Sequence, residues 1–194
     1  MTTDSKPKMR THVFFAALFM IFIILDRITK HFAATQIIKG DVTVWDGVLK
    51  FHYLENRGAA WGLFENAFWL FYIVTAVVIL IMVFMYSKIP FEKRYFFLRF
   101  LLVMLCAGAV GNFIDRALYK YVIDFIWIEA INFPVFNVAD IYVTVSVLLL
   151  VIALLFVYNK DSLFSPKKTN DDLIKKNDPD NTQTDAANQK DENE

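Results

Sequence analysis

The sequence is poor in the residues that build metal and disulfide sites. Cys106 is the only cysteine among 194 residues, so no disulfide can form within the chain. The three histidines, His12, His31 and His52, are too scattered to form the helical pair that a zinc protease uses. We therefore expect neither a metal site nor a cofactor.

Net charge and nucleotide-binding motifs are lacking too. The chain has 20 Lys and Arg residues against 20 Asp and Glu residues, and its pI is near 6.8. This balance argues against a nucleic-acid partner. The sequence contains no G-x-x-x-x-G-K-[ST] loop and no G-x-S-x-G elbow.

Long apolar segments are what the chain has instead. It is 57% hydrophobic and 16% aromatic, with a mean hydropathy of +0.42. The apolar residues fall into blocks at 13–25, 67–86, 96–114 and 141–158. About 20 apolar residues in a helix cross a hydrocarbon core of about 30 Å. The sequence predicts an all-α membrane protein with four transmembrane helices within residues 12–158.

The first apolar block has a second interpretation, because basic residues precede it as they do in a secretory signal peptide. However, the block leads into Asp26, Arg27 and Lys30 rather than a small-residue cleavage site. This favours a retained transmembrane helix.

The distribution of basic residues predicts the orientation. An even number of spans places both termini on one side, and Lys and Arg cluster at residues 1–11, between spans two and three, and after span four. The positive-inside rule assigns these regions to the cytoplasm. Residues 159–194 are polar and contain few apolar side chains, which predicts a disordered cytoplasmic tail.

A β-hairpin is predicted between the first two spans. Residues 41–45 and 48–54 are rich in β-branched and aromatic side chains, and Asp46-Gly47 separates them. This dipeptide is typical of a type I′ turn. We expect a small extracytoplasmic sheet within residues 35–60.

Four acidic residues lie at the ends of apolar blocks: Asp26, Asp115, Asp124 and Asp140. An Asp at the centre of a membrane costs about 2.5–3.5 kcal/mol, so such acids are candidates for function. If span four returns from the face that span three reaches, Asp124 and Asp140 lie at one depth. Two close carboxylates share a proton, which allows one to act as base and the other as acid, as in aspartic proteases.

Each polar position also has a purely structural interpretation. Asn137 is a plausible N-cap for span four, with Asp140 favoured by the helix dipole. Asp26 and Lys30 have the i,i+4 spacing of a helical ion pair worth roughly 0.2–0.5 kcal/mol. The same kind of interpretation gives an Asp115–Arg116 ion pair, helix packing at Gly108 and Gly111, and an ordinary turn at Asn56-Arg57-Gly58. These interpretations do not explain why all the polar residues fall on one side of the membrane.

Two other classes of function compete with a peptidase. One is a proton- or ion-coupled transporter that uses the four acids as a relay, and the other is a non-enzymatic membrane assembly factor. A relay should continue across the membrane, but spans two and four carry no ionisable residue at mid-depth. This argues against transport.

Five motifs together resemble those of the bacterial lipoprotein signal peptidases, the signal peptidase II family. Their order and spacing match from span one to span four, and the motifs are Asp26-Arg27-Ile28-Thr29-Lys30, Asn56-Arg57-Gly58-Ala59-Ala60-Trp61, Gly111-Asn112-Phe113-Ile114-Asp115-Arg116, Val122-Ile123-Asp124-Phe125 and Phe136-Asn137-Val138-Ala139-Asp140.

The resemblance implies a multi-pass aspartyl endopeptidase of the bacterial inner membrane, with its active site near the outer face. Four helices around one site are enough for a monomer, which is the state we expect. Its substrates would be prolipoproteins, cut just before a cysteine that carries diacylglycerol, with membrane lipid as the surrounding partner. Asp124 and Asp140 match the catalytic pair. The positions matching substrate-binding or supporting residues are Asp26, Lys30, Asn56, Gly58, Gly108, Asn112, Asp115, Arg116, Asn137 and Ala139.

Overall fold

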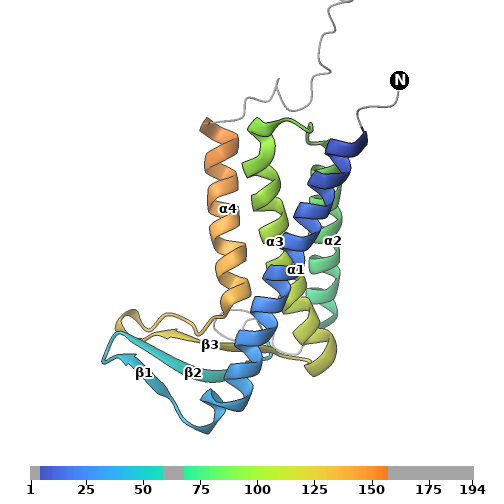
Figure 1. Cartoon of the computed structure of the whole chain (residues 1–194). Coiled ribbons are helices and arrows are strands. Elements are labelled where there is room, and N and C mark those ends of the chain that lie inside the picture. The colour runs from blue at the N-terminus through green and yellow to red at the C-terminus, as the bar shows by residue number, and fades with distance from the viewer. Residues whose placement is uncertain (1–4, 59–67, 157–194) are drawn as a thin grey trace, which may run out of the picture. The chain divides into compact units, whose positions relative to one another are not determined.

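Four long helices run side by side and a small sheet lies at one end of them (Figure 1). The computed structural model describes residues 5–58 and 68–156, so Trp61 and the predicted tail at 159–194 lie outside the described residues. The helices are α1 (Ser5–Thr35), α2 (Phe68–Lys88), α3 (Phe96–Tyr119) and α4 (Val138–Phe156). Single 3-10 turns lie at η1 (Ile37–Lys39), η3 (Lys93–Tyr95) and η4 (Glu129–Ile131).

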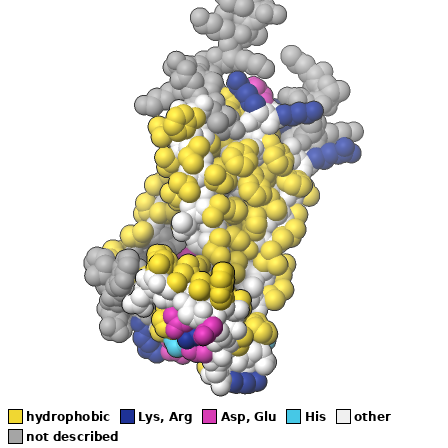
Figure 2. Space-filling view, turned by 90° about the vertical axis from the view of Figure 1, so that its left-hand side faces the viewer, with side chains coloured by type: hydrophobic (Ala, Val, Ile, Leu, Met, Phe, Trp, Pro, Cys, Tyr) yellow, Lys and Arg dark blue, Asp and Glu magenta, His cyan; other side chains and the backbone are white. Residues whose placement is uncertain are grey.

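The helices are built for a membrane. Three stretches are long and apolar enough to cross it, Lys8–Lys39, Lys93–Tyr119 and Val138–Phe156, and α2 adds a shorter apolar stretch at Tyr72–Lys88. Figure 2 shows hydrophobic side chains covering the helical part, with charged side chains gathered toward its two ends. The predicted all-α membrane fold with a small sheet is confirmed, and the chain is a multi-pass membrane protein.

Helix α3 packs against α1, α2 and α4, and its small residues set the closest approach. A Cβ atom at Gly108 would lie 2.6 Å from the carbonyl oxygen of Ala139 and 2.9 Å from Cγ2 of Val143. Only glycine allows α4 to approach this closely. The packing interpretation of Gly108 is therefore correct, and the contact fixes the start of α4.

The sheet contains one strand that was not predicted from the sequence. Strands β1 (Val42–Trp45) and β2 (Leu49–Asn56) form the expected hairpin, and β3 (Val122–Ile128) pairs antiparallel with β2. Ile123 and Phe125 of β3 pack on Ala33 near the end of α1 and on Ile37 of η1. This small core holds the sheet against the helices.

The predicted type I′ turn in the hairpin is wrong. Only Gly47 has a positive φ there, +68°, and the Val48 N–H donates to the Trp45 carbonyl oxygen at 3.0 Å. A glycine with positive φ at the third position is typical of a type II turn. The pairing register shifts between Thr43 and Trp45, and the hairpin forms with this other turn.

Candidate active site

Asp124 and Asp140 come from different elements and line the same cavity. Asp124 lies in β3, and Asp140 lies in the first turn of α4. The cavity has a volume of about 570 Å³ and lies at the end of the helices that carries the sheet. Its other lining residues are Asn56, Gly58, Arg116, Phe133, Pro134, Val135, Phe136, Ile141, Thr144 and Val145. Two acids therefore meet in a largely apolar chamber.

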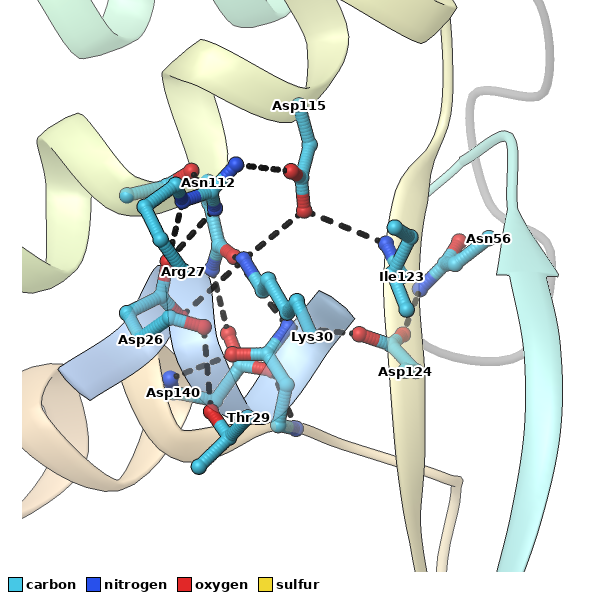
Figure 3. Close-up of polar contacts among 12 residues, drawn as sticks. Asp26, Arg27, Thr29, Lys30, Asn56, Asn112, Asp115, Ile123, Asp124 and Asp140 are labelled. Atoms are coloured by element: carbon cyan, nitrogen blue, oxygen red, sulfur yellow. Dashed lines mark hydrogen bonds and ion pairs between the residues drawn. The ribbon is translucent and has the colours of Figure 1, made fainter. Parts of the chain in front are cut away.

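Both carboxylate oxygens of Asp124 accept hydrogen bonds from neutral amides (Figure 3). Asn56 Nδ2 donates to Oδ2 at 2.8 Å, and Asn137 Nδ2 donates to Oδ1 at 2.6 Å. Asp124 is only 2% exposed. Burial, reinforced by the negative charge of Asp140, raises the pKa of Asp124 to about 7, although the two amides act in the opposite direction. A proton is therefore available on this carboxyl near neutral pH.

Asp140 is likewise bound by neutral donors. Asn112 Nδ2 donates to its Oδ1 at 2.7 Å, and the Asn137 backbone N–H donates to its Oδ2 at 3.1 Å. The Asp140 N–H donates in return to Asn137 Oδ1 at 3.1 Å. This reciprocal arrangement is a helix cap. The N-cap interpretation is thus correct, and the same asparagine also binds Asp124.

The other two acids, Asp26 and Asp115, bind cations instead. Arg27 contacts both of them at 2.5 Å, through Nη2 to Asp26 and through Nη1 to Asp115. Lys30 Nζ lies 3.2 Å from Asp26 Oδ1 and 2.8 Å from Asp115 Oδ2. The i,i+4 pair of Asp26 and Lys30 exists, but it is one edge of a buried network that joins α1 to α3.

Asn112 connects this ion network to the Asp124–Asp140 pair. Its Oδ1 accepts from Lys30 Nζ at 2.8 Å and from Asn137 Nδ2 at 3.1 Å. Because an ammonium group only donates, Lys30 fixes the Asn112 oxygen on its own side and directs the amide nitrogen toward Asp140. Lys30 therefore positions a residue that contacts the acid pair.

Three further residues that the sequence matched to supporting positions also lie at the site: Gly58, Ala139 and Arg116. The Gly58 N–H donates to Asn56 Oδ1 at 3.0 Å, which orients the Asn56 amide toward Asp124. Ala139 is fully buried against Gly108 and Gly111. Arg116 lines the cavity, and its carbonyl oxygen accepts from the Tyr72 hydroxyl at 2.7 Å.

Arg27 and Gly111 contribute to the site although neither was predicted from the sequence as a site residue. The Arg27 guanidinium joins Asp26, Asp115 and the Gly111 carbonyl oxygen, the last at 2.8 Å. A Cβ atom at Gly111 would lie 2.7 Å from Asp26 Oδ2, so glycine leaves room for this carboxylate. The available signal was the position of Arg27 at the end of an apolar block beside Asp26.

Metal binding receives no support from the described residues, which contain no group of three His, Cys, Asp or Glu side chains arranged to hold an ion. A metal-independent site stays a prediction.

The match to known proteins decides the family. Residues 18–156 match the family described as Signal peptidase (SPase) II, which is most of the chain. The chain belongs to the signal peptidase II family. It is a protease of an aspartic peptidase family, and this membership sets aside the transporter and assembly-factor hypotheses.

Relatives and solved structures agree with this assignment. The lipoprotein signal peptidase of Clostridium novyi is 41% identical over 143 residues, covering 71% of this chain and 95% of the relative. That of Lactobacillus johnsonii is 37% identical, covering 73% and 92%. A bacterial membrane enzyme solved by the in meso method at 2.3 Å is 33% identical, with a TM-score of 0.63 over 80% of this chain and 93% of that chain.

Proposed function

We propose that Asp124 and Asp140 are the catalytic pair of a prolipoprotein signal peptidase that cuts just before a diacylglyceryl-modified cysteine. The observation that carries the proposal is that both acids line one cavity while amide groups donate to their oxygens. Neutral donors hold a carboxyl in place without fixing its charge. The pair can therefore exchange a proton during a reaction.

The reaction follows from one shared proton. The ionised carboxyl removes a proton from a water molecule, which attacks the carbonyl carbon of the scissile peptide bond. The protonated carboxyl donates a hydrogen bond to the carbonyl oxygen as negative charge develops there. Collapse of the tetrahedral intermediate breaks the C–N bond, and the leaving nitrogen takes up a proton from the pair. No cofactor is required for these reaction steps.

The cavity suits a lipid-anchored peptide. It lies where the helices meet the sheet, so acyl chains can remain in lipid while the peptide segment enters between β3 and α4. Ile141, Val145 and Phe136 offer apolar walls that exclude water from the bond being cut. Asn56 and Asn137 hold Asp124, while Asn112 and the Asn137 backbone hold Asp140.

The orientation in the cell completes the proposal. The protein lies in the bacterial inner membrane as a monomer, with both termini in the cytoplasm and the acid pair near the outer face. The basic residues at the end opposite the sheet, among them Lys88, Lys93 and Arg94, support this orientation.

A substrate comparison tests the function. Purified enzyme in detergent is given two synthetic peptides that are identical except for diacylglycerol on the cysteine, and mass spectrometry identifies the products. We expect cleavage of the modified peptide on the N-terminal side of its cysteine. Equal cleavage of the unmodified peptide, or a cut elsewhere, would contradict the proposed specificity.

A further inference from the structure

A buried arginine lies at the end of the helices opposite the active site. Arg99, in the first turns of α3, is 2% exposed. Its Nη2 donates to the Ile89 carbonyl oxygen at 2.5 Å, and its guanidinium lies over the rings of Phe91, at 4.0 Å, and Tyr86, at 4.7 Å. Its Nη1 is buried and has no hydrogen-bond partner among the described residues. A charged donor left in this state costs free energy unless a ligand accepts from it.

Arg99 lines a small cavity with a positive balance of charge. The cavity has a volume of about 130 Å³, and Thr11, Lys93 and Glu92 also line it. The Glu92 carboxylate pairs with Arg94 at 3.0 Å, which compensates its charge. Arg99 and Lys93 therefore favour an anion, and the planar guanidinium matches the oxygens of a phosphate.

An apolar cavity adjoins this charged one. Its volume is about 430 Å³, within the usual range for ligand sites of about 300–1,000 Å³. Phe15 lines both cavities, and Tyr86 lines the apolar one while its ring faces Arg99. The remaining wall comes from α1, α2 and α3 and includes Ala16, Met82 and Val103. The cationic cavity thus continues into an apolar groove.

We propose that these two cavities together bind one glycerophospholipid, separately from the peptidase substrate. The phosphate accepts from Arg99 Nη1 and pairs with Lys93, and an acyl chain occupies the groove beside Phe15 and Ala16. A free anion would leave the groove empty, and a lipid without phosphate would leave Nη1 without an acceptor. The lipid joins α1 to α3 and to the α2–α3 connection, far from the acid pair.

Lipid binding by native mass spectrometry tests this proposal. Full-length protein is purified in maltoside detergent and titrated with dioleoylphosphatidylglycerol. We expect one tightly held lipid in the wild type and about tenfold weaker binding in Arg99→Met, because a hydrogen bond to a charged group is lost. Lys88→Met is the matched control. Lys88 is an exposed cation at the same end that lines neither cavity, and its loss should change binding less than twofold.

A second variant covers the case that Arg99→Met does not fold. Ala16 lines the groove but not the charged cavity, so Ala16→Phe fills the groove while Arg99 itself is unchanged, and it should weaken phosphatidylglycerol binding to a similar degree. Wild-type affinity in a folded Arg99→Met variant, or in Ala16→Phe, would overturn the proposal.

Two further ligands separate the contribution of the acyl chains to binding from that of the phosphate group. Dioleoylglycerol has the same chains without phosphate, so it should bind more weakly than phosphatidylglycerol, and Arg99→Met should not weaken its binding. Inorganic phosphate should not displace the lipid at millimolar concentration. Dioleoylglycerol binding as tight as that of phosphatidylglycerol would reduce the site to an apolar groove, and full displacement by phosphate would reduce it to an anion-binding site. Either result would contradict the proposed phospholipid.

Discussion

The two pairs of buried acids differ in the partners that they meet. Asp26 and Asp115 are fully buried and lie within 3.2 Å of the cationic groups of Arg27 and Lys30. Asp124 is almost as buried, but the donors that bind it come from Asn56 and Asn137. Burial alone therefore does not distinguish an acid with a structural role from an acid that can take part in a reaction.

The partner decides what each pair can do. A carboxylate held by two cations belongs to a network that is stable only while it is complete. A carboxyl held by amides keeps its position in either protonation state, as general acid–base chemistry requires. Asn112, which accepts from Lys30 and donates to Asp140, is the link between the two pairs.

The largest expected effect is on turnover at the amide-bound pair. Asp124→Asn and Asp140→Asn should each reduce cleavage of a lipidated prolipoprotein by at least about 10⁴-fold, because an amide cannot exchange the shared proton. The double variant should be no worse than either single one, since the two groups act as one unit. Thermal unfolding in detergent serves as the folding control. Substantial turnover by a folded single variant would remove that residue from the pair.

The next largest effect is expected on protein stability, when a cation that binds Asp26 and Asp115 is removed. Lys30→Met leaves Asp26 and Asp115 with one cation in place of two and should cost about 3–5 kcal/mol of unfolding free energy. Lys39→Met is the matched control, because Lys39 is exposed at the end of the same segment, and it should cost less than about 0.5 kcal/mol. Denaturant unfolding in mixed micelles measures both. Equal stability of the two variants would show that the ion network is not structural.

A smaller effect is expected where packing positions Asp140. Gly108→Ala places a Cβ atom 2.6 Å from the Ala139 carbonyl oxygen, and such overpacking costs typically about 1–3 kcal/mol. The start of α4 must shift, so cleavage should fall while binding of the substrate changes less. Gly40→Ala meets no atom within 4 Å and should leave the rate unchanged. Comparison of kcat and KM for the two alanine variants decides whether the contact positions the acid.

The pH dependence should give the smallest effect. Asp124, with its pKa near 7, loses its proton as the pH rises through neutrality, and the pair then lacks the proton that Asp124 supplies. The rate should fall about tenfold for each pH unit above this value. The measurement is kcat/KM from pH 5 to 9, with unfolding followed at each pH to exclude denaturation. A rate that stays constant up to pH 9 would show that the proton is held elsewhere.

Local pattern in the sequence was enough to predict the helices, the hairpin and the family. Apolar blocks of membrane length predict helices wherever they occur, and alternating β-branched residues around Asp46-Gly47 predict two strands. The order of the motifs predicted that Asp124, Asp140 and their asparagines belong to one site. The turn type was missed because the dipeptide fits more than one turn: Gly47 has the positive φ that was expected, but Asp46 does not.

Contacts between distant segments came only from the folded chain. The pairing of β3 with β2 brings Asp124 beside Asn56, 68 positions earlier, and Arg27 reaches Asp115 across 88 positions. Which amide or cation an acid meets depends on how closely α1, α3 and α4 pack, and Gly108 and Gly111 set that distance. The spacing of apolar residues in the sequence shows which face of a helix is buried, but not which element packs against that face. The division of four acids into an ion network and a pair bound by amide groups was therefore decided by tertiary packing.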